Sequence, residues 1–248
     1  MILNSMKTLK IFFACVGLTL TTFTFNSCMN DDNSYSLGDM WMSIATARPL
    51  SDNTFYITLD DSTTLWPAAP LYIYYQPDKP QRVQINYTVL GDNYQGYDHV
   101  IKLNRIDTIL TKSIAENMGE DNDSAYGNDP VEISGIWIGD GFLNILFKAY
   151  FSGNVKHSVN LIQTGTVDAP YEVEFRHNAC RDHSSYLRYG IVAFDLSQID
   201  TKGKNVTLTI KVNTFNGVKE IEKKYNSGEN TEVQPELNWD KISLKDME

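Results

Sequence analysis

The sequence lacks the features that mark several large classes of protein. Its 248 residues carry 21 basic and 31 acidic side chains, which gives a net charge of −10. An acidic chain repels phosphate backbones, so a nucleic-acid partner is not expected. No glycine-rich loop leads from a strand into a helix, and no serine occupies a Gly-x-Ser-x-Gly elbow. We therefore expect no nucleotide or other cofactor, and the motifs of a serine hydrolase are missing.

Cysteine is also scarce, with only Cys15, Cys28 and Cys180 present. Cys15 lies in a segment that resembles an export signal, and Cys28 stands where such a signal would be cut. Once the first is removed and the second is modified, Cys180 is the single free thiol. An intrachain disulfide is then excluded.

A metal site is not expected either, although His177, Cys180 and His183 offer two imidazoles and a thiol within seven residues. Zinc accepts such ligands in four-coordinate sites. A fourth ligand is not evident, and Arg181 places a positive charge beside the candidate ion. A turn held by hydrogen bonds of His177 and Asn178 is the favoured interpretation.

The first 27 residues are typical of a secretory signal peptide. Lys7 and Lys10 precede an apolar run over residues 11–20, and no acidic residue interrupts them. A membrane-spanning helix needs about 20 apolar residues, and this run is too short. Removal of residues 1–27 leaves a mature chain of 248 − 27 = 221 residues, and its net charge changes from −10 to −12.

Ser27-Cys28 resembles the end of a bacterial lipobox. The resemblance implies that the thiol of Cys28 takes a diacylglycerol, that the chain is cut before it, and that the new amine is acylated. Several acyl chains, of palmitate type, anchor a protein stably. Residues 28–38 then form a polar tether, whose Asp31 and Asp32 resemble a surface-export tag. We expect a lipoprotein anchored in the outer membrane, which faces either the periplasm or the cell surface; the alternative is an ordinary secretory signal with an incidental cysteine.

Strand patterns fill residues 39–112. Apolar and polar residues alternate over Phe55 to Leu59 and, most clearly, over Val83 to Val89. A long last strand is expected from His99 to Leu110. About five strands in some 75 residues favour a small barrel of the oligonucleotide/oligosaccharide-binding (OB) type.

Residues 113–130 differ in composition, because they are acidic, contain glycine and have few apolar side chains. We expect a linker or mobile loop here. Asp123-Ser124-Ala125 resembles the three-residue O-glycosylation motif of exported Bacteroidota proteins. Because Ser124 lies in the expected loop, it is the favoured glycosylation site.

Residues 131–248 again show strand patterns. Apolar residues alternate over residues 143–151 and over residues 206–213. Asn216-Gly217 follows the second of these runs and is typical of a tight hairpin turn. The sequence therefore predicts an all-β chain, in which the OB-type barrel is followed by an antiparallel β-sandwich.

Two groups of short motifs resemble those of NigD-like lipoproteins. The motifs of the first group lie at residues 60–67, 81–90 and 96–98, and those of the second at residues 128–130, 136–138, 143–145, 176–179 and 192–196. The resemblance covers nearly all of the mature chain. It implies an N-terminal OB domain and a C-terminal β-sandwich, in a family named for a bacteriocin-immunity context. It brings no catalytic residues.

Four aromatic residues, Trp66, Tyr72, Tyr74 and Tyr75, gather among prolines in the barrel region. Aromatic faces stack on sugars or bases in OB barrels, so these residues are the candidate ligand-binding site. The alternative is that they pack in the core, and we favour it for Trp66 because aromatic residues mostly serve burial.

The sequence thus favours a non-catalytic lipoprotein of the cell envelope that binds a glycan, an outer-membrane protein or an incoming toxin. A role in bacteriocin immunity is a special case that rests on the family resemblance. The alternative is a carbohydrate-active enzyme that acts at the cell surface with its carboxylates.

Overall fold

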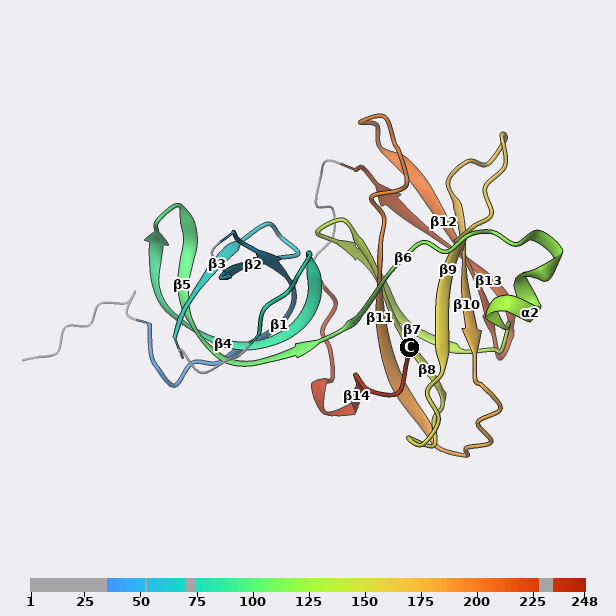
Figure 1. Ribbon diagram of the computed structural model, residues 1–248, viewed down its shortest axis with the longest axis horizontal. Coiled ribbons are helices and arrows are strands. Elements are labelled where there is room, and N and C mark those ends of the chain that lie inside the picture. The colour runs from blue at the N-terminus through green and yellow to red at the C-terminus, as the bar shows by residue number, and fades with distance from the viewer. Residues whose placement is uncertain (1–34, 52, 70–74, 228–233) are drawn as a thin grey trace, which may run out of the picture. The chain divides into compact units, whose positions relative to one another are not determined.

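Five strands of the N-terminal half close into a barrel, in which neighbours follow the order β1-β2-β3-β5-β4 (Figure 1). The structure is a computed structural model that describes residues 35–51, 53–69, 75–227 and 234–248. The barrel strands are β1 (Trp41–Pro49), β2 (Phe55–Leu59), β3 (Thr64–Ala69), β4 (Gln81–Tyr94) and β5 (Tyr97–Thr108). The expected OB-type barrel is confirmed.

The barrel core comes from the alternation that is visible in the sequence. Val83 and Ile85 of β4 are completely buried, and they pack with Ile57 of β2 and Ile101 of β5. The opposite face of β4 carries polar residues, a type that usually faces solvent. Arg82 on that face is instead completely buried, because it lies against the sandwich.

Two sheets form the C-terminal sandwich, and this prediction is also confirmed. One sheet has the order β13-β12-β10-β9 and the other the order β14-β11-β8-β7. Their strands are β7 (Glu132–Gly139), β8 (Phe142–Tyr150), β9 (Ser158–Gln163), β10 (Glu172–Asn178), β11 (Leu187–Asp195), β12 (Val206–Thr214), β13 (Gly217–Tyr225) and β14 (Ile242–Ser243). Most pairs are antiparallel, but β10 with β12 and β11 with β14 are parallel.

The core of the sandwich lies between the two sheets. Leu143, Ile145 and Phe147 of β8 alternate inward and are completely buried. They belong to one apolar cluster with Leu208 and Ile210 of the opposite sheet. Because successive side chains of a strand point to opposite faces, every second side chain of these strands lies between the two sheets.

The residues expected to form a linker pack on the sandwich instead. After β5, strand β6 (Leu110–Ser113) pairs with β11, so the boundary expected after residue 112 falls inside a strand. The N–H of Ala115 then donates to the carbonyl of Leu161, and Asn117 donates to the carbonyl of Gln163. A 3₁₀ turn (Gly119–Asp121) and helix α2 (Asn122–Tyr126) follow. The segment is rich in polar residues because most of its side chains face solvent, although it is hydrogen-bonded to the sandwich.

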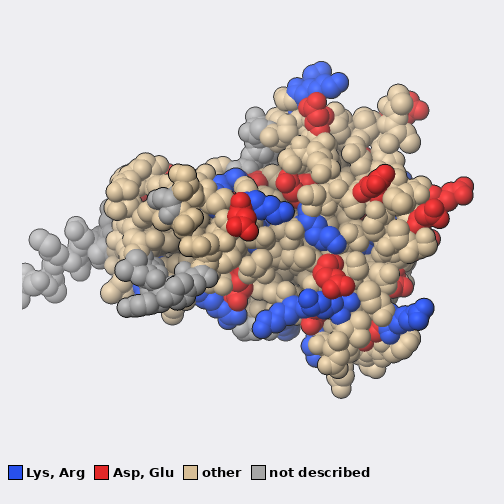
Figure 2. All heavy atoms as spheres, viewed as in Figure 1, with Lys and Arg blue, Asp and Glu red and all other residues tan. Residues whose placement is uncertain are grey.

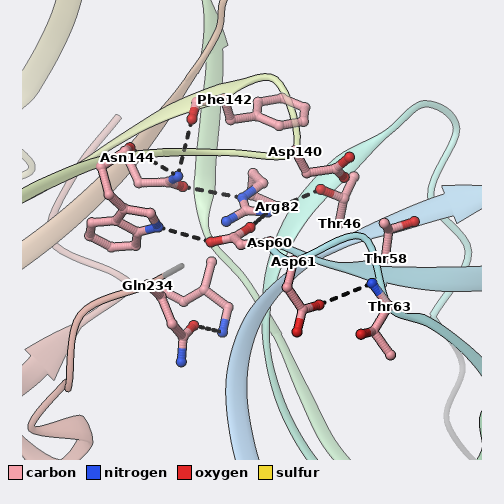
Figure 3. A network of polar contacts seen from close by, with 12 residues as sticks. Thr46, Thr58, Asp60, Asp61, Thr63, Arg82, Asp140, Phe142, Asn144 and Gln234 are labelled. Atoms are coloured by element: carbon pink, nitrogen blue, oxygen red, sulfur yellow. Dashed lines mark hydrogen bonds and ion pairs between the residues drawn. The ribbon is translucent and has the colours of Figure 1, made fainter. Parts of the chain in front are cut away.

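A buried polar network joins the barrel to the sandwich (Figure 3). Arg82 of the barrel forms an ion pair with Asp60, with 2.7 Å between Nη1 and Oδ1. The indole N–H of Trp137 in β7 donates to Oδ2 of Asp60 at 2.9 Å, and Nε of Arg82 donates to Oδ1 of Asn144 in β8 at 3.2 Å. A Cβ on Gly139 would overlap the carboxylate of Asp60. Only glycine therefore lets β7 approach this network.

The C-terminal segment adds a second connection between the two halves. Oε1 of Gln234 accepts a hydrogen bond from the N–H of Ile44 in β1 at 2.6 Å. Leu237 is buried in a cluster that includes Ile44 and Trp137. Residues 35–248 form one compact unit as a result. Within the described part of the chain, no helix is long and apolar enough to cross a membrane.

Candidate functional site

The predicted aromatic site is brought together only in part. Tyr72 and Tyr74 lie outside the described residues, as does Cys28. Tyr75 is half-buried, and its ring packs edge-on against Phe55 with 5.5 Å between the ring centroids. Burial raises the pKa of the Tyr75 hydroxyl above its ordinary value. For Tyr75 the core alternative therefore holds.

Trp66 belongs to a different group of aromatic rings. Its neighbour Leu65 points into the barrel and is completely buried, so Trp66 points outward from β3. The Trp66 ring stacks on Tyr97 at 5.1 Å and 29°, and it lies 6.4 Å from Tyr94. Tyr97 in turn contacts Tyr56 at 5.4 Å. We call these four residues the aromatic row.

Four barrel strands each contribute one residue to the aromatic row. Tyr56 comes from β2, Trp66 from β3, Tyr94 from β4 and Tyr97 from β5. Tyr94 and Tyr97 are paired across the tight turn between β4 and β5, where Gly96 has a φ of 91°. Tyr94 is 37% exposed and the other three rings are half-buried. The row is therefore supported by packing and still accessible from solvent.

Two ionised carboxylates adjoin the row. Asp98 follows Tyr97 and accepts hydrogen bonds from the N–H and the hydroxyl of Thr64, both at 2.7 Å, which lower its pKa. Asp92 accepts a hydrogen bond from the Tyr35 hydroxyl, and this bond is the main reason that the pKa of Asp92 is lowered; contact with His99 lowers it further. Both groups can accept hydrogen bonds from a ligand, but neither holds a proton for acid catalysis.

Charged side chains are unevenly spread over the molecule. Figure 2 shows one face, on which Lys, Arg, Asp and Glu gather mainly over the sandwich and only a few stand on the barrel. Stacked aromatic rings with carboxylate acceptors beside them fit an uncharged ligand with hydroxyl groups better than they fit a polyanion.

The sequence around His177 forms the expected turn. Asn178 accepts a hydrogen bond from the N–H of Cys180 at 2.8 Å, and His177 is buried against the carbonyl of Asp129. Cys180 is exposed. Among the described residues, no group of three or more His, Cys, Asp or Glu is arranged to hold a metal ion. Sequence reasoning missed the partner of His177, which is His157 on the neighbouring strand.

Ser124 lies on α2 and is exposed, but its hydroxyl donates to the carbonyl of Asp121 at 2.9 Å. Its neighbour Asp123 forms an ion pair with Arg176 of β10. The segment around Ser124 is therefore helical, and the ion pair binds it to the sandwich. Glycosylation at Ser124 stays a prediction.

Two family models match the chain over most of the described residues. The NigD-like N-terminal OB domain matches residues 44–109, and the NigD-like C-terminal β-sandwich domain matches residues 113–225. The chain belongs to the NigD-like family. The order of the two domains is the order of the barrel and the sandwich in the structure.

Solved structures of similar fold come from species of Parabacteroides and Bacteroides. A protein of Parabacteroides distasonis described only as toxin-related is 47% identical, with 76% of this chain and 94% of that chain covered and a TM-score of 0.69. A protein of unknown function from Bacteroides vulgatus is 23% identical, with 83% and 100% covered and a TM-score of 0.68. A NigD-like immunity protein of Bacteroides caccae is 18% identical, with 77% and 99% covered and a TM-score of 0.59. No curated protein matches the chain.

Proposed function

We propose that this NigD-like protein is a non-catalytic lipoprotein of the outer membrane that binds a glycan of the cell envelope through the aromatic row. The supporting observation is the stack of Trp66 on Tyr97, which continues to Tyr56 and Tyr94 of two further barrel strands. Sugar rings carry apolar faces that stack on such surfaces, and their hydroxyl groups donate to carboxylates like Asp98.

The state of the carboxylates argues against the alternative of a glycosidase. Glycoside hydrolysis needs a carboxylic acid that keeps its proton near neutral pH, together with an ionised partner. Asp92 and Asp98 adjoin the aromatic row, and hydrogen bonds lower the pKa of both. Neither Asp92 nor Asp98 therefore supplies the protonated carboxylic acid that this reaction needs.

Lipidation of Cys28 would hold the binding face close to the membrane. Six residues lie between Cys28 and Tyr35, where the described residues begin, which makes seven residue-to-residue steps. An extended chain of that length spans at most about 25 Å.

The immunity role named for the protein of B. caccae is a second candidate. In that case an incoming toxin, or the envelope glycan that the toxin uses, would occupy the same face.

The experiment uses the soluble mature chain, from which the signal and Cys28 are removed. Binding to size-fractionated envelope polysaccharide is measured by titration calorimetry for the unaltered chain, for Tyr94→Ala and for Trp66→Ala. Loss of one stacking ring costs about 1–3 kcal/mol, so the affinity should fall about five- to 150-fold. Tyr150→Ala is the matched control, because Tyr150 is also an exposed aromatic residue but lies on the sandwich.

Three results would overturn the proposal. Folded Tyr94→Ala and Trp66→Ala chains that bind with unchanged affinity would remove the aromatic row from the site. An equal loss in Tyr150→Ala would show that the effect is not specific to the row. Release of new reducing ends from the polysaccharide would show an enzyme.

A further inference from the structure

A line of four polar groups crosses the interior of the sandwich near one end. Nδ1 of His177 lies 3.2 Å from the carbonyl oxygen of Asp129, and Nε2 of His177 lies 2.9 Å from Nδ1 of His157. Nε2 of His157 then lies 3.2 Å from Oδ2 of Asp182. His157 is 0% exposed and His177 is 3% exposed. We call these groups the histidine line.

The number of protons in the histidine line follows from its contacts. Three gaps separate the four groups, and each gap needs one proton to form a hydrogen bond. The line ends in a carbonyl oxygen and a carboxylate, both of which only accept. Two neutral imidazoles bring two protons. One gap would then place two lone pairs face to face inside the protein, which is costly in a buried site.

We propose that the folded protein binds one additional proton in the histidine line, so that His157 is an imidazolium between the carboxylate of Asp182 and a neutral His177. His157 then donates through both ring nitrogens, and His177 donates through Nδ1 to the carbonyl of Asp129. Every gap is filled. The buried charge on His157 is balanced directly by Asp182, as buried charges require.

The neighbours of His177 and Asp182 are consistent with this assignment. Asp182 also accepts a hydrogen bond from the N–H of Ser152 at 2.7 Å, and this bond is the main cause of its lowered pKa. It is therefore a carboxylate. Burial, and next the charge of His157, lower the pKa of His177 to about 4, so His177 is the neutral member of the pair.

The other charged groups near His157 are accounted for as well. The His157 ring also packs against the uncharged ring of Phe151, with 4.3 Å between the ring centroids. The carboxylate of Asp129 is engaged by the N–H of Ala179 at 2.8 Å. From the C-terminal segment, the backbone carbonyl of Asp246 accepts a hydrogen bond from the N–H of His157, and Oδ2 of the Asp246 carboxylate is buried without a hydrogen-bond partner among the described residues.

Two further ionisable residues near the histidine line are His183 and Glu248. His183 is exposed on the loop after β10 and lines a hollow of about 440 Å³ beside the histidine line. The N–H of Glu248 donates a hydrogen bond to the carbonyl of His157, and the carbonyl of Glu248 accepts one from the N–H of Val159.

The additional proton therefore helps to hold two segments on the sandwich. They are the loop after β10 and the C-terminal end of the chain. Asp182 belongs to the loop after β10, which forms one wall of the hollow. The backbone of His157 pairs with the chain end at Asp246 and Glu248. When the proton leaves, one hydrogen bond of the line is lost and Asp182 is left without a cation. The loop and the chain end should then loosen together.

The sign of the pH dependence is fixed by linkage. The unfolded chain has ordinary imidazoles, which are neutral above about pH 6.5, whereas the folded chain keeps its additional proton. The folded state thus binds one proton more. The equilibrium constant for unfolding should rise about tenfold per pH unit above that pH, until the folded protein also releases the proton.

Nuclear magnetic resonance of the ¹⁵N-labelled mature protein tests the proton count directly. At pH 7.5, both ring nitrogens of His157 should carry protons, whereas only Nδ1 of His177 should carry one. His183, which is exposed, serves as the internal reference. A single protonated nitrogen on His157 at pH 7.5 would overturn the proposal.

Amide exchange then tests what the proton holds. In the unaltered protein, the amides of Val159 and Glu248 should lose protection between pH 7 and 9 beyond the ordinary effect of base. In His157→Gln, which can donate to Asp182 but carries no charge, this additional loss should be absent; in His183→Gln it should remain. If His157→Gln does not fold, Asp182→Asn replaces it, and His157 should then be neutral at pH 7.5. An imidazolium in Asp182→Asn, or an unchanged pH profile in His157→Gln, would refute the assignment.

Discussion

Replacement of Gly139 by alanine tests whether the barrel and the sandwich are held together by their buried polar network. A Cβ at position 139 would overlap all three carboxyl atoms of Asp60. These atoms cannot move aside cheaply, because Asp60 is bound to Arg82 and to the indole of Trp137. Gly139→Ala should therefore expel the Asp60 carboxylate from the network.

The expected loss of stability follows from what stays behind. Arg82 is completely buried and would keep only its contacts to Asn144 and to the hydroxyl of Thr46, at 3.2 and 3.1 Å. Removal of one partner of a buried ion pair costs about 3–5 kcal/mol, because the other charge is left without compensation. We expect the free energy of unfolding of Gly139→Ala to fall by that amount.

Chemical denaturation, followed by circular dichroism and by tryptophan fluorescence, measures the change. Gly91→Ala is the matched control, since Gly91 also lies in a strand but a Cβ there would make an ordinary contact of 3.5 Å with Val100. It should cost about 1 kcal/mol or less. In a double-mutant cycle, Gly139→Ala should add little to Asp60→Ala, because both act by removing the same carboxylate.

Two results would refute this reasoning. A Gly139→Ala protein as stable as Gly91→Ala would show that β7 can shift without disturbing Asp60. Additive losses in the double mutant would show that Gly139 acts through something other than the Asp60 carboxylate.

Two further predictions concern the N-terminus and the acid limit of stability. Cys28→Ala should move the protein from the membrane fraction to the soluble fraction, because acyl chains supply the attachment; unchanged fractionation would contradict lipidation. His177 has a pKa lowered from 6.5 to about 4, so the unfolded chain takes up its proton first as the pH falls. His177 should therefore account for a loss of up to about 3 kcal/mol between pH 6.5 and pH 4. Denaturation of His177→Gln over this range should show a shallower pH dependence, and an identical slope would exclude His177 as the cause.

The strands could be predicted from the sequence because their signal is local. Alternation over Val83 to Val89 and over residues 143–151 places one side chain in every pair in a core, and the structure has both strands. The same rule fails for Arg82. A polar residue on the outer face of a strand is expected in water, and only the arrival of a second domain at that face buries it.

The aromatic row could be predicted only in part for a related reason. Trp66 stands out in the sequence, but its partners Tyr56, Tyr94 and Tyr97 are distant from it along the chain and meet it through strand pairing. His157 was missed in the same way, since 20 residues separate it from His177. Contacts between strands depend on pairing and register, which residue spacing in a single sequence does not contain.

Composition misled the interpretation of residues 113–130, and the reason bears on function. An acidic, apolar-poor segment looks like a linker, yet Asp123 is paired with Arg176 and β6 is paired with β11. The barrel therefore has no free hinge on its C-terminal side: it passes directly into a strand of the sandwich and is locked there by Asp60 and Arg82. The barrel and the sandwich should therefore move as a single body, and the aromatic row should keep its orientation relative to the sandwich.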